Sequence, residues 1–252
     1  MSNFKLNWKP SPPDNRDKLS IRPFKLTGVK IPVKFELPLP IAVYDQQDIG
    51  SCVANSAALC YKYEIAERAK SFEPSRLFLY YTTRALQGWE NEDSGCYIRD
   101  AFKSMNKTGL ASESTWPYET HKYPVKPPFA AYDDAKKHLV VKYAKVEQNR
   151  LAMQQTLLSG AAVSFGFSVY ESFMTRKWFK TGKMPLPAKG EELLGGHAIA
   201  AIGFCNRRKA FLIQNSWGTE WGQKGKFWMP YSFALNSDYC DDFWCIENIE
   251  EK

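Results

Sequence analysis

The fold is decided at Asp45-Gln46-Gln47-Asp48-Ile49-Gly50-Ser51-Cys52, a polar, turn-forming stretch that ends in a cysteine. Directly after it, residues 53–64 are rich in Ala and in long side chains, with apolar residues at helical spacing. Cys52 is therefore predicted to lie at the N-terminus of a buried helix. The first turn of a helix carries unpaired N–H groups and partial positive charge, which favour a nucleophilic thiolate. Taken alone, Cys52 is weak evidence for catalysis, because a free cysteine is often only a small core residue.

The length and the hydropathy pattern limit the classes of protein that this chain can belong to. Its 252 residues suffice for one large domain or two modest lobes. The sequence contains no stretch of about 18 apolar residues, so no transmembrane helix and no membrane partner are expected. The start, residues 1–6, lacks a hydrophobic signal core. We therefore expect a cytoplasmic or otherwise intracellular protein, and association with a virion is compatible with that location.

The cysteines and histidines are few. The six cysteines are Cys52, Cys60, Cys96, Cys205, Cys240 and Cys245, and the three histidines are His121, His138 and His197. The cysteine spacing is too sparse for a secreted disulfide scaffold, and no Cys or His cluster has the spacing of a zinc site. The sequence thus predicts a reducing compartment and neither a metal nor an organic cofactor.

Residues 1–35 form a basic, proline-rich arm. They hold eight Lys or Arg residues against two Asp residues, whereas the rest of the chain is nearly neutral. Such an arm is compatible with binding nucleic acid or an acidic surface. The apolar residues Phe4, Leu6, Trp8 and Phe24 favour instead an extended segment that lies against the protein, with a disordered tail as the alternative.

The chain changes character along its length. Helices are predicted over residues 52–70, 74–87, 99–107 and 149–159, and strands over 139–146, 161–169, 198–204, 210–215 and 226–230. Residues 36–44 are expected to be extended. Helices followed by antiparallel strands predict an α+β fold with two segregated parts.

Three further features belong with Cys52. Paired glycines precede His197 at the expected start of an apolar strand, and they leave open space beside its imidazole. Asn215 ends another strand, and its amide is suited to accept the imidazole N–H, while the indole of Trp217 could shield that contact from water. Gln46, six residues before Cys52, could direct its side-chain NH₂ towards a developing oxyanion together with the Cys52 N–H.

Taken together, these residues resemble the papain family of cysteine peptidases. The resemblance rests on a glutamine six residues before a helix-opening cysteine, on Gly195-Gly196-His197-Ala198, and on Asn215-Ser216-Trp217-Gly218. It covers roughly residues 36–249. It implies a helical lobe at about 45–135, an antiparallel β-barrel-like lobe at about 136–249, and a cleft between them.

A finer resemblance is to the bacterial and large-virus branch of the family, typified by xylellain. It rests on Trp8-Lys9-Pro10, Pro13-Asp14-Asn15-Arg16-Asp17, Val43-Tyr44-Asp45-Gln46 and Asp241-Asp242-Phe243-Trp244. In that branch the N-terminal arm is short and can lie across the cleft. We therefore expect residues 1–35 to act as a cleft-covering regulatory segment, as in a zymogen, and residues 36–252 to form the peptidase domain.

The resemblance also implies subsites for a peptide substrate. The positions expected to line them are Gly95, Cys96, Tyr97, Ile98, Phe165, Gly195 and Gly196. Cys96 departs from the Gly-Gly pattern of papain-like enzymes at the specificity wall. Ile49 and Val53 depart as well, because papain has a disulfide-bonded cysteine and a tryptophan there. The implied S2 pocket is apolar and has no acidic residue at its base.

The expected reaction is hydrolysis of peptide bonds in a peptide or protein substrate. In it Cys52 is the nucleophile, His197 its proton acceptor, Asn215 the orienting amide, and Gln46 an oxyanion donor. Two alternatives stay open. One is a catalytically silent papain-like binding or structural component, and the other is a deamidase or transglutaminase that uses the same triad.

Overall fold

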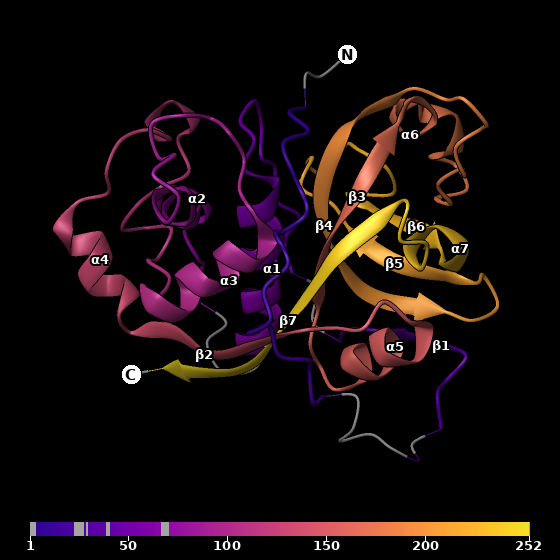
Figure 1. Ribbon diagram of the computed structural model, residues 1–252, viewed down its shortest axis with the longest axis horizontal. Coiled ribbons are helices and arrows are strands. Elements are labelled where there is room, and N and C mark those ends of the chain that lie inside the picture. Colours follow the sequence, from indigo (N-terminus) through magenta and orange to yellow (C-terminus); the bar gives the residue numbers. More distant parts are fainter. Residues whose placement is uncertain (1–3, 23–27, 29, 39–40, 67–70, 252) are drawn as a thin grey trace.

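The computed structural model describes residues 4–22, 28, 30–38, 41–66 and 71–251. The longer helices are α1 (Cys52–Ile65), α2 (Arg76–Ala85), α3 (Ile98–Lys107), α4 (Phe129–Ala135) and α5 (Arg150–Leu158). The short ones are η2 (Thr120–Lys122), α6 (Glu171–Met174), η3 (Arg176–Trp178) and α7 (Tyr231–Ala234). Figure 1 shows α1–α4 gathered on one side, most of the sheet on the other, and the N-terminal segment running between them.

The strands pair into one antiparallel sheet. They are β1 (Lys34–Glu36), β2 (His138–Lys145), β3 (Val163–Tyr170), β4 (Leu193–Cys205), β5 (Ala210–Gln214), β6 (Lys226–Pro230) and β7 (Cys240–Glu251). The order is β2-β7-β3-β4-β5-β6, with β1 pairing on β4. The α+β class and the antiparallel pairing are thus confirmed. The lobe is not a closed barrel, because the pairings of the described strands run along an open path.

Several predicted boundaries shift for local reasons. The helix expected from residue 74 begins at Arg76, because the Ser75 side chain accepts the Phe78 N–H and caps the helix. Asn149 caps α5 in the same way. The first helix ends at Ile65 rather than at residue 70, and residues 67–70 lie outside the described part of the chain.

The strand that carries His197 is longer than predicted. It begins at Leu193, so His197 lies within β4 and pairs with Phe167 of β3 instead of starting the strand. Gly195 and Gly196 also pair with β3. The glycines were expected before the strand, but they are part of it, and the backbone of the N-terminal segment approaches them closely.

Besides β1 and the short helices η2, α6, η3 and α7, two longer elements were not predicted from the sequence. The helix α4 is short and half exposed, so its apolar pattern is weak. The strand β7 lies between β2 and β3, although acidic residues interrupt its sequence. One of them, Asp242, has a φ of +67° and a buried side chain, so it marks a local irregularity rather than a strand end.

The helix α1 is buried between the helical half and the sheet. All its residues except Glu64 are buried. Ser56 donates to the backbone oxygen of Ile199 at 2.7 Å and lies 2.7 Å from the hydroxyl of Ser164, which ties the helix to β4 and β3. This packing fixes the N-terminus of α1, and with it Cys52, at the junction of the lobes. Among the described residues, no helix is both long and apolar enough to cross a membrane.

A buried arginine organises the loop that borders this junction. Arg84 of α2 is fully buried, and its guanidinium donates to the backbone oxygens of Glu90 at 2.8 Å and Tyr123 at 2.6 Å, and also to that of Glu92. It stacks over the ring of Tyr80 at 3.9 Å. Carbonyl oxygens thus replace the water that the buried charge has lost.

We expect Arg84→Met to lower the free energy of unfolding by about 3 kcal/mol, because several loop carbonyls lose their donors together. Urea denaturation followed by tryptophan fluorescence measures this loss. The matched control is Arg207→Met, at an exposed arginine in the turn after β4. Equal stability of the two variants would contradict the organising role of Arg84.

Candidate active site

Cys52 opens α1 and is fully buried. Backbone amides of Ala198, Val53 and Asn7 hydrogen-bond its sulfur, which places the nucleophile candidate between α1, β4 and the N-terminal arm. Burial nevertheless raises the pKa of the Cys52 thiol to about 11, because the amides only partly replace lost hydration. With the arm in place, Cys52 is therefore a neutral thiol at pH 7.

His197 and Asn215 form a buried pair. The Nε2 atom of His197 lies 2.7 Å from Oδ1 of Asn215, which also accepts the Ser216 N–H at 2.8 Å. An amide oxygen can only accept, so Nε2 carries the proton in this pair. The Nδ1 atom is buried and has no hydrogen-bond partner among the described residues. Burial lowers the pKa of His197 to about 4, although the contact with Asn215 opposes this shift.

Trp217 covers the pair. Its ring stacks on the imidazole of His197 with the centroids 4.5 Å apart and the planes inclined by 25°. Its indole is 3% exposed, so it excludes water from this side of the imidazole. The structure thus brings Trp217, His197 and Asn215 together, as expected from the sequence.

The side chain of Gln46 has one defined orientation. Its Oε1 accepts from Ser216 Oγ at 2.9 Å and from the indole N–H of Trp217 at 3.2 Å. The amide nitrogen must therefore face the other way. It donates to the backbone oxygen of Ile49 at 3.1 Å and to that of Lys5 at 3.2 Å. Two donors from the β lobe thus aim the NH₂ of Gln46 at backbone carbonyls of the N-terminal arm and of the segment that leads into α1.

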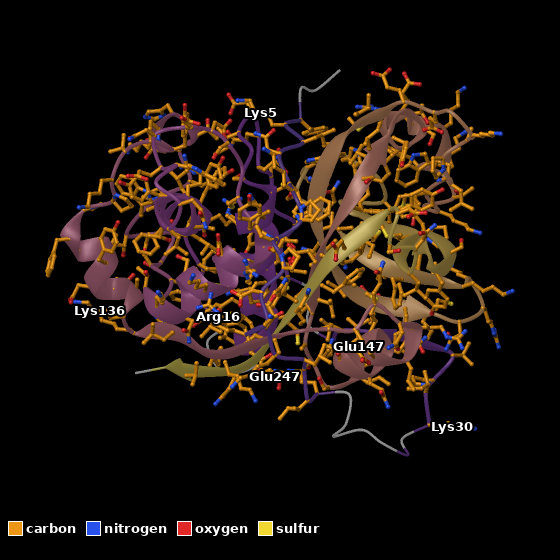
Figure 2. All side chains as sticks on the ribbon, in the orientation of Figure 1. Lys5, Arg16, Lys30, Lys136, Glu147 and Glu247 are labelled. Atoms are coloured by element: carbon orange, nitrogen blue, oxygen red, sulfur yellow. The ribbon has the colours of Figure 1, made fainter. Side chains whose placement is uncertain are left out.

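The N-terminal arm lies along this site. Phe4 stacks on Trp217 with the centroids 4.2 Å apart, and the Trp8 N–H donates to the Gly196 oxygen at 3.0 Å. In Figure 2 the arm descends between the lobes from Lys5 towards Arg16. Between its two aromatic anchors, the carbonyl of Lys5 reaches Gln46 and the amide of Asn7 reaches Cys52. The arm is thus an extended peptide bound in the cleft.

Glycines make room for this peptide. A Cβ atom on Gly95 would lie 2.2 Å from the backbone oxygen of Asn7, and one on Gly196 would lie 2.2 Å from that of Trp8. Gly95 also has a φ of +73°, which favours glycine by itself. Gly195 lies against Leu6 in the same way. Three predicted subsite glycines therefore border the arm.

Phe165 lies elsewhere than expected. It is fully buried in the core of the β lobe and stacks on Phe243 with the centroids 4.7 Å apart. The next residue, Gly166, faces the cleft, where a Cβ atom would collide with the ring of Trp8. Successive side chains of a strand point to opposite faces, so a shift of one residue exchanges core and cleft.

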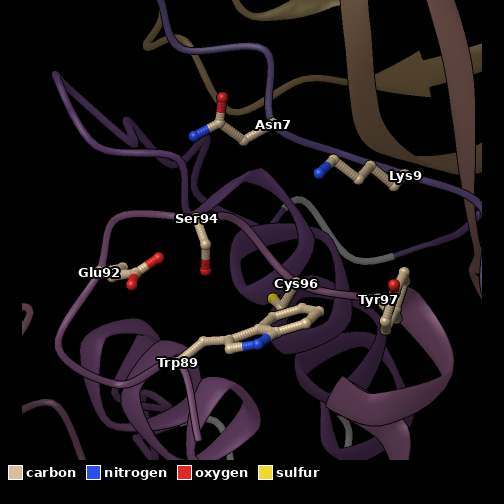
Figure 3. Close-up of a pocket in the computed structure, with 7 residues that line it drawn as sticks. All are labelled: Asn7, Lys9, Trp89, Glu92, Ser94, Cys96 and Tyr97. Carbon is tan, nitrogen blue, oxygen red and sulfur yellow. The ribbon is translucent and has the colours of Figure 1, made fainter. Parts of the chain in front are cut away.

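The other predicted subsite residues lie on the helical side. Cys96 and Tyr97 line a cavity of about 190 Å³ that Asn7 and Lys9 of the arm also border (Figure 3). Cys96 is buried, and burial raises the pKa of its thiol well above the usual value. Ile98 starts α3 and is fully buried in the core, so its side chain does not border this cavity.

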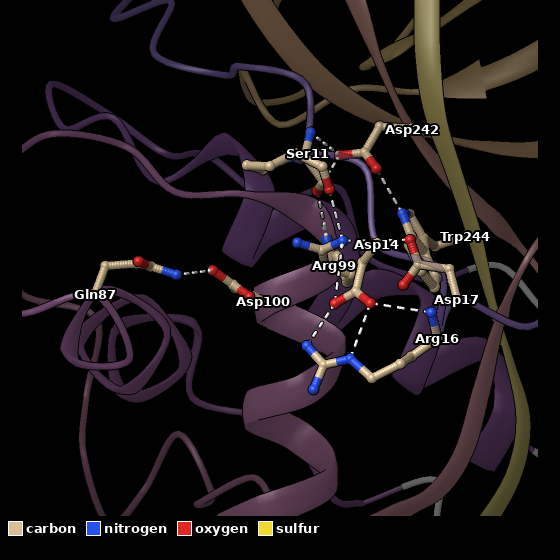
Figure 4. Close-up of polar contacts among 10 residues, drawn as sticks. Ser11, Asp14, Arg16, Asp17, Gln87, Arg99, Asp100, Asp242 and Trp244 are labelled. Atoms are coloured by element: carbon tan, nitrogen blue, oxygen red, sulfur yellow. Dashed lines mark hydrogen bonds and ion pairs between the residues drawn. The ribbon is translucent and has the colours of Figure 1, made fainter.

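Beyond its two aromatic anchors, the arm has a polar anchor that the sequence did not reveal. Ser11 donates through its N–H and its hydroxyl to the buried carboxylate of Asp242, at 3.2 and 2.7 Å. Arg99 of α3 donates to the Pro12 oxygen at 2.7 Å and to Asp17 at 3.3 Å (Figure 4). These partners are more than 80 residues away in sequence, so no local pattern could predict them.

No group of three or more metal-binding side chains occurs among the residues that the structure describes. All six cysteines are free thiols in the structure.

The chain is similar in sequence to known cysteine proteases. A family profile described as papain family cysteine protease matches residues 40–240. An uncharacterized peptidase C1-like protein of Acanthamoeba polyphaga mimivirus is 39% identical, and the match spans 96% of this chain and 86% of the viral protein. Cathepsin B of Dictyostelium discoideum is 26% identical over 88% of this chain and 76% of its own length.

The structure is similar to solved cysteine proteases as well. The crystal structure of xylellain, a cysteine protease from Xylella fastidiosa, superposes with a TM-score of 0.86 at 34% identity, covering 98% of this chain and 97% of xylellain. Pro-cathepsin B S9 from Trypanosoma congolense superposes with a TM-score of 0.70 at 15% identity, covering 98% and 84%, which shows the shared fold.

The burial of His197 predicts a pH dependence of stability. Its folded pKa, about 4, is below the ordinary 6.5, so the unfolded chain binds the extra proton first as the pH falls. This contribution is fully present above pH 6.5 and is lost towards pH 4. Between pH 7 and 4.5 the free energy of unfolding should therefore fall by roughly 2 kcal/mol more in the native chain than in His197→Gln.

Urea denaturation of the native chain and of His197→Gln at the two pH values measures this difference. The protonation of all other groups is common to both proteins and cancels. His138→Gln, at a histidine that the site does not contain, is the matched control. A native chain that loses no more stability than His197→Gln would mean that His197 is already charged in the folded protein.

Proposed function

Because this chain belongs to the papain family of cysteine proteases, we propose that Cys52, His197, Asn215 and Gln46 are its catalytic residues and that it cleaves internal peptide bonds of a peptide or protein substrate. The observation that carries the proposal is the hydrogen bond from the Gln46 amide to the Lys5 carbonyl. Gln46 thus donates to a peptide carbonyl oxygen of a segment that also contacts Cys52, through the Asn7 amide, and this supports the proposal. The extended course of the bound arm favours a peptide chain as substrate over a small molecule.

In the proposed reaction, the sulfur of Cys52 attacks the carbonyl carbon after giving its proton to Nδ1 of His197. This nitrogen is the available one, because Nε2 is held by Asn215. The oxyanion receives hydrogen bonds from the Gln46 NH₂ and the Cys52 N–H. His197 then protonates the leaving amine as the C–N bond breaks, which leaves a thioester. Water, deprotonated by His197, attacks the thioester carbon, and the C–S bond breaks. The acyl group leaves as the carboxylic acid product, and the sulfur of Cys52 takes back the proton from His197.

The arm is proposed to inhibit this reaction while it is docked. A nucleophile needs a carbonyl carbon, but the arm presents the amide of Asn7 to the sulfur of Cys52. The Lys5 carbonyl meanwhile occupies the Gln46 donor. The arm also completes the burial that keeps both the thiol and the imidazole neutral. Departure of the arm frees the oxyanion donors and rehydrates the pair, which favours the thiolate and the imidazolium.

The catalytic role of Gln46 is tested by Gln46→Ala. We expect kcat on a fluorogenic peptide to fall by about 100-fold, because one oxyanion donor is lost. The background is the full chain with Phe4→Ala and Trp8→Ala, which loosens the arm. Gln155→Ala, on α5 and outside the site, is the control and should leave kcat unchanged. Cys52→Ala should abolish turnover, and residual turnover in that variant would contradict the proposed nucleophile.

The inhibitory role of the arm is tested by the reactivity of Cys52 itself. We expect the Phe4→Ala and Trp8→Ala pair to increase the rate of iodoacetamide alkylation at Cys52 at least tenfold, as followed by peptide mass spectrometry. Leu151→Ala, at an exposed leucine on α5, is the control. Equal rates in all three proteins would mean that the arm does not shield the thiol. Thermal melts verify that the variants remain folded.

A further inference from the structure

Asp93 is a fixed carboxylate on the helical wall of the cleft. Its Oδ1 accepts the Gly50 N–H at 2.8 Å and the Tyr80 hydroxyl at 2.6 Å. Tyr80 in turn accepts the Gly95 N–H at 3.1 Å, which sets the direction of its own hydroxyl. The side chain of Asp93 is only 8% exposed. These contacts hold the carboxylate in one orientation and leave Oδ2 without a contact to Gly50 or Tyr80.

The oxygen Oδ2 binds a basic side chain of the arm. The Nζ atom of Lys5 lies 2.6 Å from it, and about half of the lysine side chain is exposed. The hydrogen bond to Asp93 raises the pKa of Lys5, against the opposing effect of burial, and the charge of Asp48 adds to the rise. The ammonium group thus lies in a negative field, although the protein as a whole carries a net charge of +7.

This anionic position lies next to the reacting atoms. Gly50, which donates to Asp93, is two residues before Cys52. The residue whose side chain reaches Asp93 is also the residue whose carbonyl accepts from Gln46, namely Lys5. A substrate residue whose carbonyl oxygen binds at Gln46 therefore starts its side chain within reach of Oδ2, and the long stems of Lys and Arg can adapt to either chain direction.

We propose that Asp93 is a specificity-determining residue, which binds the ammonium or guanidinium group of a Lys or Arg residue at the attacked carbonyl once Lys5 has left. This proposal rests on the proposed peptidase function. A bound neutral side chain displaces water from Oδ2 and offers no positive charge in return, and that penalty disfavours such substrates. Lys5 fills the same position in the docked arm, so the arm and a basic substrate compete for one carboxylate.

The test compares peptides that differ only in the residue before the reporter amide. The enzyme is the full chain with Phe4→Ala and Trp8→Ala, and the peptides carry Lys, Arg, Gln or Glu at that residue. We expect kcat/KM for Lys and Arg to exceed that for Gln by at least tenfold. In Asp93→Asn this ratio should fall below threefold, because the amide no longer attracts a basic group, while Oδ1 of asparagine still accepts from Gly50 and Tyr80 and keeps the backbone in place.

Glu92→Gln is the matched control, because Glu92 is the neighbouring acid and its side chain is exposed. It should keep the full preference for Lys and Arg. An equal preference in Asp93→Asn and its parent would overturn the proposal. So would an equal loss of activity on all four peptides, since Asp93 would then only support the Gly50 backbone.

A second measurement separates this proposal from the proposed function. In the same background with Cys52→Ala, fluorescence anisotropy reports binding of labelled, uncleaved peptides. Tighter binding of the Lys peptide than of the Gln peptide, lost in Asp93→Asn, supports the role of Asp93 even if no peptide is hydrolysed by the parent. Equal binding of the two peptides refutes it, whatever the outcome for catalysis.

Discussion

The hydrogen bonds of the Gln46 carboxamide hold the site together. Gln46 belongs to the segment that leads into α1, but its Oε1 accepts hydrogen bonds from two residues of the β lobe, Ser216 and Trp217. Backbone bonds reinforce the link, because the Gln46 N–H donates to Ser216 and the Gly218 N–H donates to Tyr44. A displacement of one lobe against the other would break all of these contacts together. The position of the amide nitrogen is therefore a direct consequence of how the lobes pack.

The residues of the candidate site could be predicted because the chemistry restricts their residue types and because the resemblance to the papain family supplies their order along the chain. The α+β order of elements follows from local patterns. The subsites depend on strand register, which the sequence does not fix to one residue, so Gly166 faces the cleft where Phe165 was expected. The course of the arm depends on partners that are distant in sequence, such as Asp242 and Arg99. Local sequence patterns contain no information about such contacts.

Asp93 combines support and recognition in one side chain. The bond from the Gly50 N–H ties the segment before Cys52 to the loop that Arg84 organises through its carbonyl contacts. The same carboxylate offers its second oxygen to a basic group in the cleft. The geometry of the recognition site is thus maintained by the buried arginine on α2, which touches neither the arm nor the nucleophile among the contacts described. Selectivity and stability share one set of hydrogen bonds here.

The far end of the arm is fastened independently of the cleft. Arg22 is buried, donates to the Ile246 oxygen at 2.7 Å, and pairs with Glu64 of α1 at 2.7 Å. An arm that leaves the cleft therefore remains a tethered ligand, with an effective concentration on the order of millimolar for a short flexible linker. Its rebinding is a first-order event that dilution of the protein does not slow. A substrate must compete with the arm at this fixed local concentration. The apparent affinity for substrate therefore depends on the equilibrium between the docked and the released arm as much as on the subsites themselves.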